Sequence, residues 1–343
     1  MWKRGLSIGC TIIGTTIGAG FASGREIWEF FASYGPAGAA GILLAMALFV
    51  TACALLLRLG QRVGDGRARS VLTALMGPWW ARLCEGMLLA HWFSLSAVMF
   101  AGSGVTVAQW GGTYRWGVVV IAVLVWVMVS LGLTGVLAIN LIVTPLLIGV
   151  LGAVVSIALW NAPLQPAPPP VSLPVWGSAV VYAALNVSPL IAVLAQLGAS
   201  IRRTGEIAVA AGTSYVVLAG LALLYNAALL NSGPEMEAMD IPLFWLARFL
   251  PPQAALVVTA VLWLALFTTA ISGVYGLTRR LSESTGRSPA AVALVLTVLV
   301  ALVSQFGFAR LVAIFYPLFG LCNLALLARV LAYPLALETK RPT

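Results

Sequence analysis

The chain has 343 residues, of which 61% are hydrophobic and 8% are charged, and its mean hydropathy is +1.03. These values exclude a soluble globular domain and indicate an all-α membrane protein that crosses the bilayer many times. The formal net charge is +9; the single histidine excludes a histidine-rich metal centre, and the four cysteines lie in apolar runs without metal-site spacing.

The first apolar stretch contains the segment 14–31, which reads GTTIGAGFASGREIWEFF. A membrane span of about 20 residues should be helical throughout, because lipid offers the backbone no hydrogen-bond partners. Here Gly14, Gly18, Gly20 and Gly24 weaken the helix by about 1 kcal/mol each relative to alanine, and glycine lets the backbone unwind. We predict a broken helix that lines a binding site at mid-membrane. The alternative is a glycine-packed contact between unbroken helices.

Three charged residues, Arg25, Glu26 and Glu29, follow these glycines inside the apolar stretch. Each charge within a span costs roughly 2.5–3.5 kcal/mol, so each needs a partner or a role. Arg25 and Glu29 are four positions apart and can pair on one face of a helix. We interpret the three residues as an outer gate that closes over a substrate; the alternative is an ion pair near the membrane interface.

Ten apolar segments follow one another along the chain. Their approximate ranges are 6–31, 37–57, 80–108, 116–133, 136–160, 175–199, 206–231, 253–278, 289–305 and 310–335. Between the seventh and the eighth, the sequence IPLFWLARFL is short and amphipathic, so we expect it to lie over the bundle rather than to span.

Proline marks two further features of the chain. Residues 161–174 contain six prolines and are predicted to form a stiff extended connector outside the membrane. The sixth apolar segment, 175–199, contains Asn186-Val187-Ser188-Pro189 at its centre. Because proline lacks a backbone donor and disfavours helix at the preceding residue, we predict a second broken span here.

Basic residues are distributed unequally between the two sides of the membrane. With the N-terminus inside, fourteen Lys and Arg residues fall on the cytoplasmic side and three outside. The positive-inside rule therefore predicts cytoplasmic N- and C-termini in a bacterial inner membrane. Anionic lipid is a sufficient partner for the net charge, so nucleic acid is not expected, and no protein partner is indicated. The cytoplasmic set is Lys3, Arg4, Arg58, Arg62, Arg67, Arg69, Arg82, Arg202, Arg203, Arg279, Arg280, Arg287, Lys340 and Arg341, and the outer set is Arg115, Arg248 and Arg310.

The two predicted breaks lie in the first and the sixth spans, so corresponding spans of two five-helix halves are interrupted. Because five is odd, the two halves have opposite orientations in the membrane. This is the inverted-repeat plan of many secondary transporters. We therefore predict residues 1–160 as the first repeat and residues 175–343 as the second, within one transmembrane domain.

The stretch GTTIGAGFASGREIWEFF resembles the first-span signature of the YkvI-like bacterial membrane proteins, which belong with the LeuT-fold, amino acid–polyamine–organocation type of transporters. The resemblance implies a sodium site between the first and eighth spans. The backbone carbonyls of Gly14 and Ile17 and the residues Ala265, Thr268 and Thr269 match the positions that form it. Carbonyl and hydroxyl oxygens suit a hard cation such as Na⁺. The alternative is that the threonines hydrogen-bond within the helix packing.

By the same resemblance, the substrate lies at the two breaks. Backbone N–H groups after the first break suit a carboxylate, and polar groups at the second break suit an amine. The rings of Phe21 and Tyr182 could close over the substrate; the alternative is that they pack within the bundle. The implied substrate-binding residues are Gly18, Ala19, Gly20, Phe21, Tyr182, Asn186 and Ser188.

The sequence favours a cation-coupled secondary transporter, driven by Na⁺, for an amino acid or a small related amine. A first alternative is the same fold driven by protons through Glu26, Glu85 or His91. One proton-coupled branch of the transporters that this sequence resembles has a lysine in the fifth span at the place of the sodium ion. The fifth span here carries no lysine, which favours Na⁺. A second alternative is a ligand-sensing receptor subunit without net transport, similar in fold to spore germinant receptor subunits. An enzyme is not expected, because no Ser/His/Asp set, HExxH or P-loop motif is present.

Overall fold

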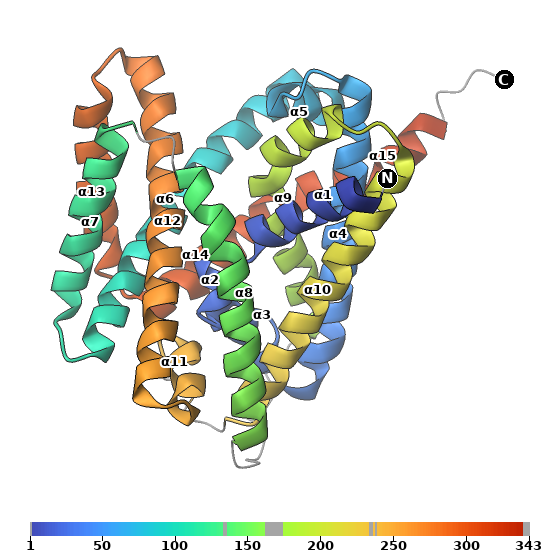
Figure 1. The fold of residues 1–343 in the computed structure, drawn as a ribbon. Helices are drawn as coiled ribbons and strands as arrows, with labels where there is room; N and C mark the ends of the chain where they lie inside the picture. Colours follow the sequence, from blue (N-terminus) through green and yellow to red (C-terminus); the bar gives the residue numbers. More distant parts are fainter. Residues whose placement is uncertain (1, 133–135, 162–173, 233–235, 237–238, 339–343) are drawn as a thin grey trace.

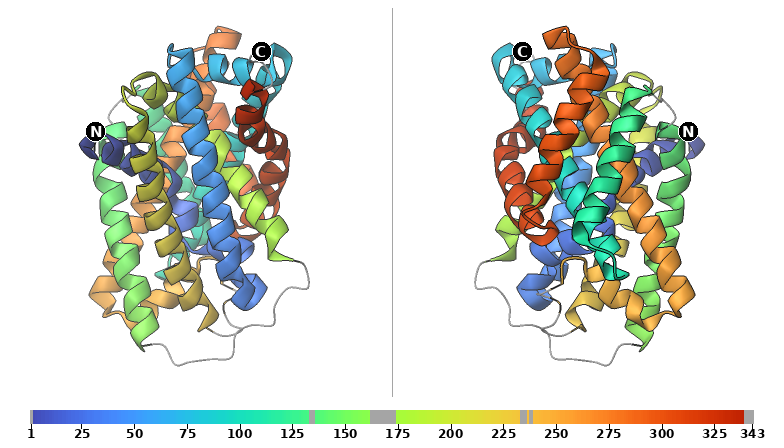
Figure 2. Two further views of the ribbon diagram at one scale, coloured as in Figure 1. Left: turned by 90° about the vertical axis from the view of Figure 1, so that its right-hand side faces the viewer. Right: turned by 90° about the vertical axis from the view of Figure 1, so that its left-hand side faces the viewer.

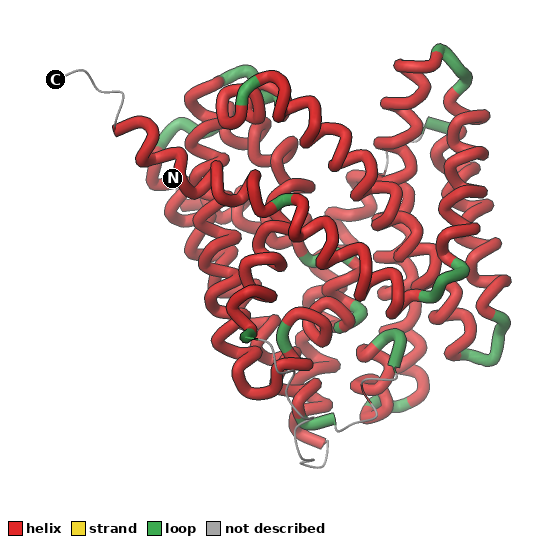
Figure 3. The backbone as a smooth tube through the Cα atoms, turned by 180° about the vertical axis from the view of Figure 1, so that it is seen from behind, coloured by secondary structure: helices red, strands yellow, loops and turns green. Residues whose placement is uncertain are grey.

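The computed structural model describes residues 2–132, 136–161, 174–232, 236 and 239–338, and within these ranges every regular element is a helix (Figures 1 and 3). The elements are α1 Trp2–Thr16, α2 Ala19–Ala22, α3 Arg25–Phe30, η1 Ala32–Ala37, α4 Gly38–Val63, α5 Ala68–Met76, α6 Pro78–Gln109, α7 Tyr114–Ser130, α8 Val136–Asn161, α9 Val175–Ala199, α10 Thr204–Leu230, α11 Pro242–Leu246, η3 Ala247–Phe249, α12 Pro252–Thr285, α13 Pro289–Ser304, α14 Phe308–Cys322 and α15 Leu324–Glu338.

The first span is broken, as its glycines predict. Helix α1 ends at Thr16, and α2 begins two residues after Ile17, with Gly18 in an extended conformation (φ −90°, ψ −175°). A second interruption separates α2 from α3 at Gly24, whose φ of 81° lies in the left-handed region that favours glycine. The chain therefore crosses the centre of the bundle as three short helical pieces.

The predicted second break is wrong. Helix α9 runs without interruption from Val175 to Ala199 and includes Pro189. A single proline removes one backbone donor, and membrane helices tolerate it where side chains and neighbouring helices satisfy the groups around it. Here Asn186 Nδ2 donates to the Tyr182 carbonyl at 2.9 Å, and Ser188 Oγ accepts a hydrogen bond from Asn323 Nδ2 at 3.1 Å. The polar sequence therefore satisfies packing contacts instead of opening the helix.

The predicted count of ten spans remains a prediction. Six helices in the described part are long and apolar enough to cross a membrane, or seven if α13 and α14, which meet at 106°, form one span. The four other predicted spans correspond to shorter helices of 15 to 17 residues: α1, α7, α13, and the pair α14 and α15, which together match the predicted span 310–335. The break after α1 and the junction between α14 and α15 at Asn323 divide segments that the hydrophobic pattern reads as continuous.

The helix packing is symmetric under exchange of the two halves of the chain. The first span of each half packs on the second span of the other half: α1 on α10, and α9 on α4. Within each half the third span packs on the fourth: α6 on α7, and α12 on α13. The fifth span of each half packs on the third and second spans of the other half: α8 on α12 and α10, and α14 and α15 on α6 and α4. Such correspondence is what an inverted repeat requires. The predicted connector, 161–174, lies outside the described residues apart from Asn161 and Pro174, so the repeat boundaries remain predictions.

The basic segments meet at one end of the bundle, where the start of α1 and the last described helix also lie (Figure 2). Arg4 donates to the Ser200 carbonyl at 2.5 Å. Glu85, at the start of α6, pairs with Arg69 at 3.8 Å and with Arg280 at 3.5 Å. The segments predicted to be cytoplasmic therefore share one end, and we refer to it as the basic end.

The opposite end is covered by residues 239–251, the described segment that leads into α12, which we call the cover loop (Figure 1). Its helix α11 lies against the bundle, with Leu243 and Leu246 fully buried, as predicted for IPLFWLARFL. The Leu243 amide donates to the Ser23 carbonyl at 2.9 Å. This bond fastens the loop to the turn between α2 and α3.

Candidate functional site

The break in the first span has open space on one side. No atom lies within 4 Å of the position that a Cβ atom on Gly18 would occupy. Gly18 is half-buried, and an exposed row of Ser7, Thr11 and Thr15, spaced four residues apart on α1, leads to it from the basic end. Asn186 of α9 is half-buried as well, although its neighbours on both sides are buried. The break is therefore more accessible than the helices around it.

The other side of the break is closed by an ion pair and by the cover loop. Arg25 Nη2 lies 2.6 Å from Glu29 Oε1, and Arg25 Nη1 donates to the Met239 carbonyl at 2.9 Å. The pairing of Arg25 with Glu29 follows the spacing in the sequence. Their role as an outer gate remains a prediction, which the link to the cover loop makes physically reasonable.

Glu26 faces away from this pair, toward the centre of the bundle. Its Oε2 accepts a hydrogen bond from the Tyr182 hydroxyl at 3.2 Å. Its carboxylate also lies against the backbone of Gly20, where an added Cβ atom would collide with Oε1 and would lie 2.7 Å from the Tyr316 hydroxyl. The three predicted gate residues therefore occupy two different environments.

The cluster of Glu26, Tyr182 and Tyr316 joins three parts of the chain, α3, α9 and α14. Tyr316 was missed by the sequence analysis. A signal was present, because a tyrosine directly before Pro317 inside an apolar span is unusual, but nothing in the sequence places it beside Glu26. The Tyr316 hydroxyl is buried and has no hydrogen-bond partner among the described residues.

The two aromatic residues predicted to close over a substrate have separate partners. Phe21 packs edge-on against Tyr225, with ring centroids 6.4 Å apart. The Tyr182 ring contacts Phe30 at 5.1 Å and Phe31 at 5.0 Å. Both are fully buried. The packing interpretation therefore describes Phe21, whereas Tyr182 also carries the polar contact to Glu26.

The residues predicted to bind sodium lie on α12, which packs against α2, and on α1 and the break that precedes α2. Thr268 is buried, and its hydroxyl donates to the Ala265 carbonyl at 3.2 Å. Thr269 is half-buried and makes no hydrogen bond with the described residues through its hydroxyl. Gly14 packs toward α8, where an added Cβ atom would lie 3.1 Å from Thr144 Cγ2, and Ile17 is buried at the break. The oxygens are of a kind that suits Na⁺, and these five positions remain a prediction.

The residues considered for proton relay lie elsewhere. Glu85 is held by arginines at the basic end. His91 is buried on α6, its ring lies edge-on to Phe319 at 5.0 Å, and its Nδ1 has no partner among the described residues. Neither residue belongs to the cluster around Glu26.

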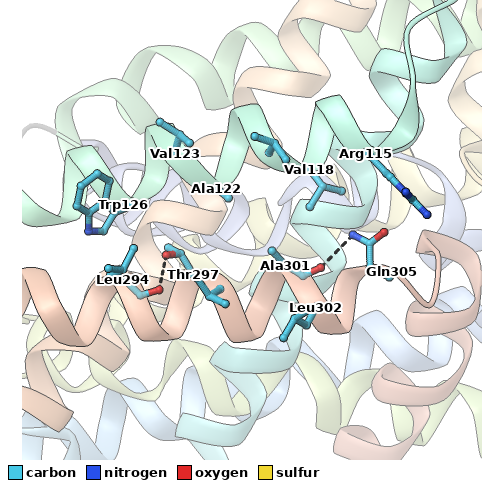
Figure 4. Close-up of a pocket in the computed structure, with 12 residues that line it drawn as sticks. Arg115, Val118, Ala122, Val123, Trp126, Leu294, Thr297, Ala301, Leu302 and Gln305 are labelled. Atoms are coloured by element: carbon cyan, nitrogen blue, oxygen red, sulfur yellow. Dashed lines mark hydrogen bonds between the residues drawn. The ribbon is translucent and has the colours of Figure 1, made fainter.

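A groove of about 530 Å³ lies between α7 and α13 (Figure 4). Its lining is mostly apolar and includes Val118, Val123 and Leu302, with Arg115 and Gln305 near one end. The groove shares no residue with the break in the first span. We therefore place the candidate site at the break and regard the groove as part of the apolar outer surface.

Comparison with known proteins gives relatives of nearly the same length. The chain is 31% identical over 346 residues to the uncharacterized protein YyaD of Bacillus subtilis, which covers 99% of this chain and 100% of YyaD. It is 28% identical over 326 residues to the uncharacterized membrane protein YkvI of the same organism, with 93% of each chain covered. No family model matches the sequence.

Solved structures with a similar fold include a Na⁺-coupled symporter. The inward-facing conformation of Mhp1 superposes with a TM-score of 0.61 at 13% identity and covers 93% of this chain and 73% of Mhp1. MhsT in complex with L-phenylalanine gives 0.60 at 18% identity, covering 95% and 91%. A Na⁺-coupled sialic acid symporter in a substrate-bound outward-open state gives 0.60 at 11% identity, covering 90% and 74%.

Proposed function

Because the chain belongs to the family of the Bacillus subtilis protein YyaD and the membrane protein YkvI and has the LeuT fold of secondary transporters, we propose that it is a Na⁺-coupled symporter for an amino acid or a small related amine. The chain is a multi-pass membrane protein, and its solved structural neighbours are transporters rather than enzymes.

One observation carries the proposal: the first span is interrupted at Ile17 and Gly18, and α2, which follows the interruption, packs beside α12. Unwound backbone within a membrane helix bares N–H and C=O groups that can bind a solute or an ion. Thr268 and Thr269 lie on α12 and are proposed to supply hydroxyl oxygens to the ion. In this proposal Na⁺ binds between the break and α12, and the solute binds on the other side of the break.

The neighbours support a symport mechanism by analogy of fold. One of them is a Na⁺-coupled symporter, and another was solved with an amino acid, L-phenylalanine. At 11% and 18% identity these likenesses concern the fold alone, so the ion and the solute are proposed for this chain on its own residues. We further propose that the protein lies in a bacterial inner membrane with the basic end in the cytoplasm, where positive charge is retained.

Uptake into proteoliposomes tests the function. Purified protein is reconstituted, and accumulation of labelled amino acids and primary amines is measured under an imposed Na⁺ gradient and, separately, under an imposed pH gradient. We expect accumulation only with the Na⁺ gradient. Accumulation driven by the pH gradient alone would replace Na⁺ with protons as the coupling ion. Binding of a solute without accumulation under either gradient would indicate a sensor instead.

A further inference from the structure

Glu26 differs from the other acidic residues held within the described helices of the bundle. Glu29 pairs with Arg25 at 2.6 Å, Glu206 with Arg4 at 3.9 Å, and Glu85 with two arginines. Glu26 has no cationic partner in the described part of the chain, although only 8% of its surface is exposed. Burial of an ionised carboxylate without a cation is strongly unfavourable, so this position requires a proton or a positively charged ligand.

The groups around Glu26 suit a ligand with several N–H donors. The Tyr182 hydroxyl donates a hydrogen bond to Oε2 of Glu26, whereas no described residue donates one to Oε1. The Tyr316 hydroxyl lies on the same side of Gly20 as Oε1 and is itself without a partner. An ammonium group has three donors and no acceptor. One donor could reach Oε1, and a second could reach the lone pairs of a tyrosine hydroxyl.

Two tyrosine hydroxyls complete the described surroundings of this carboxylate. The Tyr182 hydroxyl donates to Glu26, and the Tyr182 ring is packed by Phe30 and Phe31. The Tyr316 hydroxyl lies near the same position beside Gly20. The hydroxyl oxygens keep lone pairs that can accept hydrogen bonds from an ammonium group. A buried carboxylate beside two such hydroxyls is therefore better suited to an organic cation than to a carboxylate.

The cluster adjoins the accessible side of the break. Gly18, which borders open space, is two residues from Gly20, and half-buried Asn186 is one helical turn from Tyr182. The row of Ser7, Thr11 and Thr15 leads to the same point from the basic end. A solute at the break would thus have its polar or apolar remainder near Gly18 and its charged end near Glu26.

We propose that Glu26, Tyr182 and Tyr316 form a subsite that binds the ammonium group of the transported solute, an inference that rests on the proposed transport function. Glu26 supplies the compensating charge, Tyr182 fixes the orientation of the carboxylate, and the Tyr316 hydroxyl accepts a hydrogen bond from the ligand. Glu26 is thereby a binding residue, and the outer closure is left to Arg25 and Glu29.

Binding measurements with probes that share a branched apolar side chain and differ in their charged groups test the subsite. Purified protein in detergent is titrated with isoamylamine, L-leucine, N-acetyl-L-leucine and isoamyl alcohol, and the shift in unfolding temperature is recorded at millimolar concentrations. We expect the two probes with a free ammonium group to stabilise the wild-type protein and the two without it to have no effect. Failure of both ammonium probes to stabilise the protein, or equal stabilisation by all four, would overturn the proposal.

Variants assign the effect to the cluster. In Glu26→Gln we expect affinity for the ammonium probes to fall at least about tenfold, because a charge-assisted hydrogen bond within a buried site is lost. Glu85→Gln removes an equivalent acid at the basic end and should leave affinity unchanged. If Glu26→Gln does not fold, Glu26→Asp and Tyr316→Phe, which keep the charge or the ring, should each weaken binding severalfold. Unchanged affinity in these variants would contradict the proposal.

Transport assays separate this inference from the proposed function. If Glu26→Gln retains Na⁺-driven uptake of an amine with wild-type affinity, the subsite is wrong and the symporter stands. If the ammonium probes bind at Glu26 but no gradient drives uptake, the subsite stands and the symporter is wrong. Ammonium binding that is retained in Glu26→Gln, together with loss of pH-driven uptake, would assign Glu26 to a proton instead.

Discussion

The carboxylate of Glu26 lies directly against the backbone of Gly20, six positions earlier in the chain. The turn at Gly24 therefore brings a side chain of α3 onto the main chain of α2. Any side chain at position 20 would displace either the carboxylate or the Tyr316 hydroxyl, which lies 2.7 Å from the Cβ position.

This contact predicts different effects for two alanine substitutions. Gly20→Ala should destabilise the protein by about 1–3 kcal/mol through overpacking and should abolish binding of ammonium probes. Gly18→Ala should not be destabilised by a clash, because its Cβ atom meets no atom within 4 Å and its φ of −90° is open to alanine. Unfolding temperatures of both variants check the difference. Equal loss of stability would contradict the packing described.

A second pair of glycines separates backbone strain from steric clash. Gly24 and Gly64 both have positive φ, 81° and 76°, but only Gly24 faces a neighbour, the Tyr225 ring and hydroxyl, at 2.6–2.7 Å. Gly64→Ala should cost about 1 kcal/mol from backbone strain alone. Gly24→Ala should cost more, because the ring cannot move without breaking the Tyr225 bond to the Ala22 carbonyl, which is 3.1 Å long. Chemical denaturation of the two variants would compare these costs.

The proposed ion site predicts that sodium binding depends on two hydroxyl groups. Thr268→Ala and Thr269→Ala should each remove most of any Na⁺-dependent increase in unfolding temperature, because a hard cation loses an oxygen ligand. Thr278→Ala, on the same helix and also buried, is the matched control and should keep the increase. A Na⁺-dependent shift that survives both of the first two substitutions would place the ion elsewhere.

The continuity of α9 predicts that its proline is not required to open the helix. Pro189→Ala restores one backbone donor inside the helix, so stability should be unchanged or higher, and uptake should persist. The unfolding temperature and the initial rate of uptake check this. If Pro189→Ala lost binding and had a more stable fold, the helix would have to open locally at residues 186–189 for the protein to function.

The outer closure predicts a role for the Arg25 guanidinium. Arg25→Gln would leave Glu29 without its partner at 2.6 Å and would remove the bond to the Met239 carbonyl. We expect a loss of about 1–3 kcal/mol in stability, because the half-buried carboxylate of Glu29 is left unpaired. The cover loop should then be cleaved faster by added protease. Unchanged cleavage would show that the loop is held by its apolar contacts alone.

Much of the fold follows from the sequence, because long apolar runs and glycine positions are local signals. The long helices α4, α6, α9, α10 and α12 match predicted spans, and the glycines of the first span mark a real break. Proline is a weaker signal, because the loss of one donor opens a helix only if nothing nearby compensates. Near Pro189 the helix stays continuous, and its polar side chains make packing contacts: Asn186 donates to the Tyr182 carbonyl, and Ser188 accepts from Asn323, which lies 135 positions later in the chain.

The site was predictable only in part for the same reason. The spacing of Arg25 and Glu29 predicts their pairing, and that pairing leaves Glu26 on another face of the helix. What occupies that face depends on α9 and α14, which reach it through tertiary packing. Tyr316 could therefore not be assigned to Glu26 from its own neighbours in the chain.

The exchange symmetry of the helix packing does not extend to helix stiffness. Helix α1 is jointed at Ile17 and Gly18, whereas its counterpart α9 is a single rod of 25 residues. If the two halves exchanged their conformations, α9 would have to bend and the break between α1 and α2 would have to become helical. We therefore expect the two ends of the molecule to open by different motions. At the basic end α1 would rotate about the break at Ile17 and Gly18, and at the opposite end the segment that contains α11 would move away from the bundle.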